Sequence, residues 1–80
     1  MKFTNALTRL IDPKTKNRKL TRQKWDGRGL FVRAQWPDER SKMSSPYLYI
    51  TDPAALMGPG ITPWTPSQAD LFEDDWVEVK

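Results

Sequence analysis

The chain has 80 residues, no cysteine, no histidine and a net charge of +3. This composition excludes disulfides and the usual zinc ligands, although a domain of this length is only marginally stable without such support. We therefore expect a single domain over residues 1–80 that is stabilised as a homo-oligomer, with neither metal nor cofactor. The opening residues meet charge and proline too early for a signal peptide, and no apolar run could span a membrane, so we expect a cytoplasmic protein.

The charge is distributed unevenly along the chain. Residues 1–33 hold ten Lys or Arg against two acids, whereas residues 34–80 hold three against eight. A basic half can bind nucleic acid, but a basic and an acidic half can equally face each other within or between subunits.

The first predicted element is a short helix over residues 4–11, with Thr4 as its N-cap. Its apolar stripe consists of Ala6, Leu7, Leu10 and Ile11. Pro13 and the polar residues that follow it end the helix.

Two strands follow, over residues 19–25 and 30–36, and the Asp26–Gly27 pair predicts a hairpin turn between them. The second strand alternates Leu30, Val32, Ala34 and Trp36 with polar or aromatic residues. At strand spacing, Arg22 and Lys24 would share one face of the first strand.

For the second half of the chain, the sequence predicts five elements in order. They are a polar loop, a strand over 47–51, an ordered loop over 52–63, a helix over 68–74 and a last strand over 76–79. Ser67 is the expected N-cap of that helix, and Asp70 its capping-box partner. The fold class is therefore α+β, a small antiparallel sheet with a short helix near each end of the chain.

The four tryptophans divide into two pairs. Trp36 and Trp76 fit a core position, because one continues an apolar alternation and the other opens a strand. Trp25 and Trp64 lie at loop edges instead, where a flat ring can stack on a nucleobase.

The charged residues allow two further interpretations. Acids between residues 70 and 75 could act as a general acid and base, with Asp70 and Asp75 the better candidates, yet acids at the start of a helix are usually solvated. The lysines and arginines between residues 14 and 28 could follow a phosphate backbone, yet such runs are more often a solvated surface.

Four blocks of the sequence carry a resemblance. "ALTRL", "RQKWDGRG", "PDERSKMSSPYLYI" and "PWTPSQADLFEDDW" occur in the order and spacing of the phage and prophage family known as Thoeris anti-defence type two, and the likeness runs from about Phe3 to Val79. It implies a non-enzymatic sponge, usually a homotetramer, that sequesters the cyclic ADP-ribose isomer made by a bacterial TIR enzyme in the cytoplasm of the host. Some members of the family also bind cyclic oligonucleotides.

The candidate ligand-binding residues that follow from the resemblance are Arg22, Trp25, Lys42, Tyr47, Trp64, Ser67, Gln68 and Asp70. The two tryptophans are expected to stack on bases, Gln68 and Asp70 to contact ribose or adenine, and Arg22 or Lys42 to contact the pyrophosphate. The chain departs from the family at Phe72 and Asp74, where leucine or alanine is commoner, and in its longer, more basic connection over residues 12–19.

Two other functions stay open at this point. A nucleic-acid-binding module would use the basic half, but the acidic half argues against a wide electropositive face. A hydrolase acting through Asp70 or Asp75 has no histidine or other obvious base, which makes it the weakest of the three hypotheses.

Overall fold

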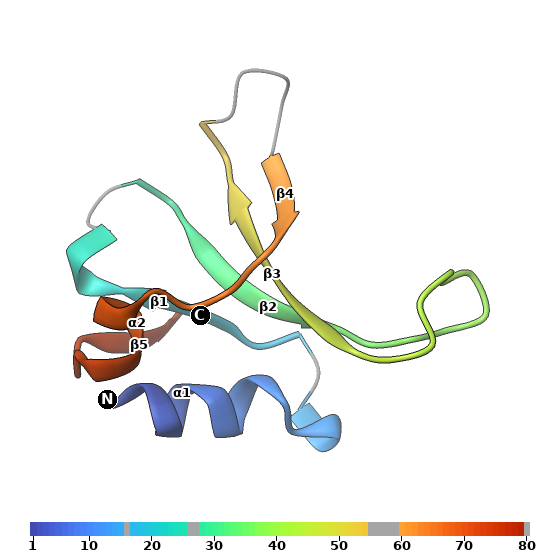
Figure 1. The fold of residues 1–80 in the computed structure, drawn as a ribbon, viewed down its shortest axis with the longest axis horizontal. Helices are drawn as coiled ribbons and strands as arrows, with labels where there is room; N and C mark the ends of the chain where they lie inside the picture. Colours follow the sequence, from blue (N-terminus) through green and yellow to red (C-terminus); the bar gives the residue numbers. More distant parts are fainter. Residues whose placement is uncertain (16, 26–27, 55–59, 80) are drawn as a thin grey trace.

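The computed structural model describes residues 1–15, 17–25, 28–54 and 60–79, and it contains one antiparallel five-stranded sheet with two helices (Figure 1). The elements in chain order are α1 (Phe3–Leu10), η1 (Pro13–Thr15), β1 (Lys19–Arg22), η2 (Gln23–Trp25), β2 (Phe31–Gln35), β3 (Tyr47–Asp52), β4 (Gly60–Pro63), α2 (Gln68–Phe72) and β5 (Trp76–Val79). The strand order is β4-β3-β2-β1-β5, which confirms the predicted α+β class.

The first helix differs from its prediction at both ends. It begins at Phe3, and Thr4 is not the N-cap: Lys2 occupies that position without a side-chain hydrogen bond. Phe3 joins the helix because its buried ring packs in the core. Ile11, expected on the buried stripe, is 52% exposed because the helix ends at Leu10.

The predicted strand over residues 19–25 is too long. Regular pairing stops at Arg22, and residues 23–25 form the short 3₁₀ turn η2. Asp75 causes this change of direction, because its backbone oxygen accepts from the Gln23 N–H and its carboxylate accepts from the Lys24 N–H. The strand alternation that predicted a shared face for Arg22 and Lys24 therefore ends at Arg22. The predicted turn at Asp26 and Gly27 lies outside the described residues.

The second half contains a strand that the sequence did not predict. Gly60–Pro63, expected to be part of a loop, forms β4 and pairs along the whole of its length with β3. Proline is tolerated at its end because β4 is an edge strand. The helix α2 ends at Phe72, two residues earlier than predicted, and residues 55–59 of the predicted loop lie outside the described residues.

The core lies between α1 and one face of the sheet. Leu20, Val32 and Trp76 are completely buried there and contact Phe3, Ala6 and Leu10 of α1. Trp76 is thus the core residue that was predicted, whereas Trp36 is only half-buried.

The opposite face of the sheet carries the alternate residues of each strand. Strand pairing places Phe31 beside Thr51, Tyr49 beside Pro63, and Ile61 beside Thr51 on that face. Ile61 is 63% exposed, and Tyr47 and Val79 are also exposed. This side of the sheet, which also carries Lys19 and Arg33, is called the open face below.

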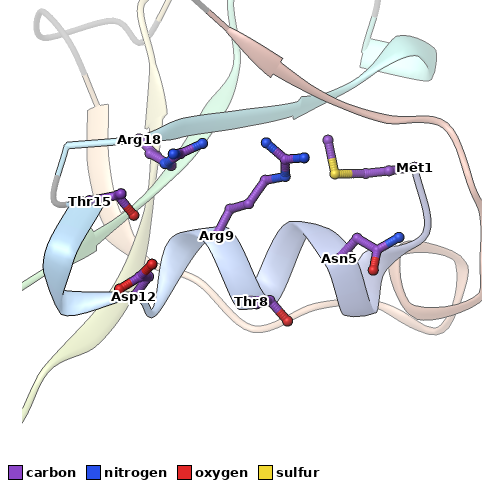
Figure 2. Close-up of a pocket in the computed structure, with 7 residues that line it drawn as sticks. All are labelled: Met1, Asn5, Thr8, Arg9, Asp12, Thr15 and Arg18. Carbon is purple, nitrogen blue, oxygen red and sulfur yellow. The ribbon is translucent and has the colours of Figure 1, made fainter.

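The helix α1 has a second, polar side. Between it and the chain leading into β1 lies a hollow of about 360 Å³, which Figure 2 shows with its lining side chains. None of the candidate ligand-binding residues from the sequence lines it. Among the described residues, no helix is long and apolar enough to cross a membrane.

Candidate functional site

Three tryptophans meet at one edge of the core. The ring of Trp25 lies 5.5 Å from that of Trp76, and the ring of Trp64 lies 5.8 Å from it, both edge-on. Trp76 is completely buried, whereas Trp25 and Trp64 are half-buried. Such edge-to-face contacts hold aromatic rings in a defined orientation. The structure therefore fixes two partly accessible indole rings against a buried one.

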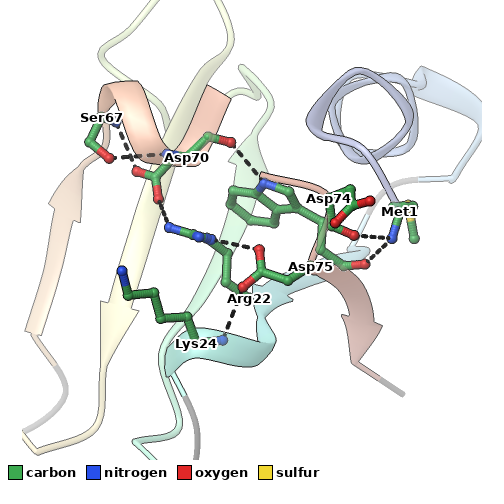
Figure 3. Close-up of polar contacts among 8 residues, drawn as sticks. Met1, Arg22, Lys24, Ser67, Asp70, Asp74 and Asp75 are labelled. Atoms are coloured by element: carbon green, nitrogen blue, oxygen red, sulfur yellow. Dashed lines mark hydrogen bonds and ion pairs between the residues drawn. The ribbon is translucent and has the colours of Figure 1, made fainter. Parts of the chain in front are cut away.

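A buried ion network lies beside this tryptophan cluster (Figure 3). The guanidinium of Arg22 donates from Nη1 to Asp70 Oδ1 and from Nε to Asp75 Oδ1, each at 2.9 Å. Arg22 is 4% exposed and Asp70 is 6% exposed. Since Arg22 ends β1, Asp70 lies in α2 and Asp75 precedes β5, the network joins three segments that are distant in sequence.

Asp70 also organises the start of α2. Its Oδ2 accepts from the Ser67 N–H at 2.8 Å, while the Ser67 hydroxyl accepts from the Asp70 N–H, so the predicted capping box is confirmed. The Asp70 carbonyl accepts from Trp76 Nε1 at 2.9 Å. Both carboxylate oxygens of Asp70 are thus engaged within the chain.

The ion network sets the protonation states of its members. The hydrogen bond with Asp75, and then that with Asp70, raises the pKa of Arg22 although burial opposes this. The hydrogen bond from Arg22 lowers the pKa of Asp75 below its usual range, against the effect of burial. Arg22 and Asp75 are therefore both charged at neutral pH.

A hollow of about 310 Å³ opens next to the tryptophan cluster. Trp25 lines it together with Thr21, Gln23 and Phe31, and Arg22 also contributes to its wall. Its volume is at the lower end of the range for small-molecule pockets. The hollow is therefore large enough for one nucleoside moiety.

The other candidate residues are divided between two regions. Ser67 and Gln68 are exposed at the start of α2, near the ion network. Tyr47 lies on the open face, 6.5 Å from Tyr49 between ring centres, and lines a separate hollow of about 290 Å³. Lys42 is exposed in the loop between β2 and β3, which projects away from α2 (Figure 1). Of the candidates, only Arg22 and Trp25 line the hollow of about 310 Å³. Asp70 and Ser67 are linked to Arg22 through the ion network, and Trp64 is linked to Trp25 through Trp76, whereas Tyr47 and Lys42 lie elsewhere.

Sequence reasoning missed one feature of this region, the mutual pairing of Arg22 with Asp70 and Asp75. These partners are 48 and 53 residues away, so no local pattern could connect them. The exposed side chain of Lys24, which was not among the candidates, extends alongside the Arg22–Asp70 pair in Figure 3.

The architecture and this edge define a small α+β protein with a tryptophan cluster held by a buried ion network. The chain belongs to the Tad2-like family, because the family model, described as the Thoeris anti-defense 2-like domain, matches residues 1–79. A search of curated proteins finds no match. Membership confirms the family indicated by the resemblance and supports a phage anti-defence role against the Thoeris system.

Proposed function

We propose that this protein binds and sequesters a cyclic ADP-ribose-type signalling nucleotide made by a bacterial TIR enzyme, without degrading it, in the cytoplasm of the infected cell. The effector of Thoeris defence would then receive no free signal. The observation that carries the proposal is the pair of half-buried tryptophans, Trp25 and Trp64, held in place against Trp76.

The tryptophan pair supplies part of the affinity that sequestration requires. Stacking on an aromatic side chain contributes about 1–3 kcal/mol per base, whereas a nanomolar dissociation constant corresponds to about −12 kcal/mol. Rings that are already oriented by Trp76 lose little freedom on binding, which favours tight association. The remaining affinity must come from polar contacts and enclosure.

The polar contacts divide between structural and exposed groups. Arg22 and Asp70 are committed to each other, so we assign them a positioning role in place of the direct ligand contacts expected from the sequence. Ser67 and Gln68 are exposed, and their side chains can form hydrogen bonds with ribose or adenine. Lys24, which is exposed beside Trp25, suits the pyrophosphate.

Enclosure favours a homo-oligomer, with a tetramer as in the family. A hollow of about 310 Å³ on one chain surrounds only part of a dinucleotide-sized ligand. The open face, with Ile61, Tyr47 and Val79 exposed, offers an apolar surface for a second copy. A second copy could also bring Lys42 or Tyr47 to the site, since one chain does not.

The chemistry of the chain suits binding better than catalysis. Asp75 and Asp70, the carboxylates considered as an acid and base pair, are both paired with Arg22. The hydrogen bond from Arg22 lowers the pKa of Asp75, which makes this carboxylate a poor proton donor at neutral pH, and the side chain of Asp70 is engaged in structural hydrogen bonds.

The proposal is tested by calorimetric titration of the purified protein with a cyclic ADP-ribose isomer from a Thoeris TIR enzyme. Trp25→Ala and Trp64→Ala should each weaken binding at least about tenfold, since each removes one stacking contact. Trp36→Ala is the matched control, because that tryptophan lies outside the cluster, and it should bind like the parent. Equal affinity in all four proteins would refute the assignment. A strong loss of affinity with added salt would instead favour the nucleic-acid module.

A further inference from the structure

The polar hollow behind α1 (Figure 2) is separate from the tryptophan cluster and contains two arginines that converge. Arg9 Nη1 lies 3.0 Å from Glu78 Oε1, and Arg18 Nη1 lies 2.7 Å from the same oxygen. The two guanidinium nitrogens are consequently within roughly 6 Å of each other. Two positive charges therefore share a single carboxylate oxygen, and they come from different elements of the fold.

The arginine pair carries one positive charge more than Glu78 neutralises and has unused donors, while Asp12 on another wall brings the sum of these four side chains to zero. A guanidinium presents five N–H groups in a planar fork that matches the oxygens of a phosphoryl group. The contacts with Glu78 use only Nη1 of each arginine. Figure 2 shows both side chains reaching into the space between α1 and the chain that enters β1.

A second observation points to a ligand in the same hollow. The hydroxyl oxygen of Thr15, one of the lining residues, is buried and makes no hydrogen bond to any protein group in the part of the chain that the structure describes. Buried hydroxyls in native proteins are nearly always bonded to protein, water or ligand, so this hydroxyl is available to a molecule bound in the hollow. Thr15 and the arginines lie on walls contributed by different segments, which gives the hollow polar groups on more than one side.

Asp12 also lines the hollow and limits what can bind there. Its Oδ1 accepts from the Lys14 N–H at 2.9 Å, as part of the turn after α1. The carboxylate would repel a second anion but can accept hydrogen bonds from hydroxyl groups. In a ligand with one phosphoryl group and several hydroxyls, the phosphoryl group can contact the arginines and the hydroxyls can contact Asp12 and Thr15. A hollow of about 360 Å³ is large enough for such a ligand.

We propose that the hollow between α1 and β1 is a binding site for a small phosphate ester of a polyol. Arg9 and Arg18 hold the phosphoryl group, and Thr15 and Asp12 face the hydroxyls. Glu78 is the internal anion that keeps the two arginines together when the site is empty. Desolvation acts to raise its pKa, but the hydrogen bonds from Arg18 and Arg9 together lower it.

The test is titration of the full-length protein with glycerol 3-phosphate and, separately, with inorganic phosphate, followed by calorimetry and by NMR of the arginine Nε–H groups. Parent protein should bind glycerol 3-phosphate, and Arg9→Gln and Arg18→Gln should each weaken binding about tenfold or more. Arg40→Gln removes the same charge from the exposed loop between β2 and β3 and is the matched control. It should leave binding unchanged.

Glu78→Gln gives the sharpest outcome. It removes the competing carboxylate while it keeps the size of the side chain, so glycerol 3-phosphate should bind several-fold more tightly. A purely structural role for the arginine pair predicts no such gain. No binding to the parent at millimolar concentration, equal losses in Arg18→Gln and Arg40→Gln, or weaker binding in Glu78→Gln would each overturn the proposal. Equal affinity for inorganic phosphate and for the ester would overturn the polyol part of it.

Discussion

Replacing Arg22 by methionine tests whether the ion network holds the tryptophan cluster in place. Methionine keeps most of the length and the apolar stem but removes both hydrogen bonds to carboxylates. The side chain of Asp70 is 9% exposed and that of Asp75 is 21% exposed, so two largely buried negative charges would lose their partner. Removing one member of a buried ion pair costs about 3–5 kcal/mol, because the remaining charge stays poorly solvated.

That cost is large for a chain of this size. A domain of 80 residues has a free energy of unfolding of roughly 4–12 kcal/mol. For domains of this length, each kcal/mol lowers the melting temperature by about 4–8 °C, so Arg22→Met should lower it by about 12–40 °C. Binding should weaken as well, since β1, α2 and β5 would lose their common anchor.

The assay is thermal unfolding followed by circular dichroism, at one protomer concentration because an oligomer unfolds in a concentration-dependent way. Arg40→Met, in the exposed loop between β2 and β3, is the matched control and should change stability by no more than about 0.5 kcal/mol. A melting temperature for Arg22→Met within about 4 °C of the parent would refute the reasoning.

Three further predictions follow from the same contacts. The pKa of Asp75 is lowered in the folded state, so its contribution to stability is complete above about pH 5 and is lost as the pH falls below about 4; urea unfolding of Asp75→Asn should show a flatter pH dependence there. Ser67→Ala removes the capping box and should lower the free energy of unfolding by about 1 kcal/mol in the same assay; an unchanged free energy would show that packing alone holds α2 in place. Ile61→Lys places a charge on the open face and should reduce the mass measured by light scattering without changing the circular dichroism spectrum; an unchanged mass would place the subunit interface elsewhere.

Local features of the sequence predicted much of the fold. The capping box of Ser67 and Asp70 depends on two residues three positions apart, and it is present as expected. Alternation correctly placed Val32 in the core, and the start of the last strand correctly placed Trp76 there. In each case a pattern within a few residues was enough for the prediction, although the burial of Val32 and Trp76 depends on contacts with α1.

Long-range contacts decided the features that were not predicted. Gly60–Pro63 is a strand because it pairs with β3, although glycine and proline are typical of loops. Trp25 leaves the path of β1 because Asp75, 50 residues or more along the chain, bonds to the preceding backbone. The sequence offered candidate residues for the site but not the pairing of Arg22 with Asp70 and Asp75, because the burial of Arg22 depends on partners that only the tertiary fold brings together.

The proposed sequestration is tested most directly by recovery of the ligand. The purified protein is incubated with the cyclic ADP-ribose isomer from a Thoeris TIR enzyme, free ligand is removed, the protein is denatured by heat, and the released compound is identified by mass spectrometry and by its ability to activate the Thoeris effector. We predict that intact, active signal is released from the parent protein and not from Trp64→Ala. Release of a chemically altered product would contradict sequestration and indicate an enzyme, and no retained ligand would contradict binding of this signal.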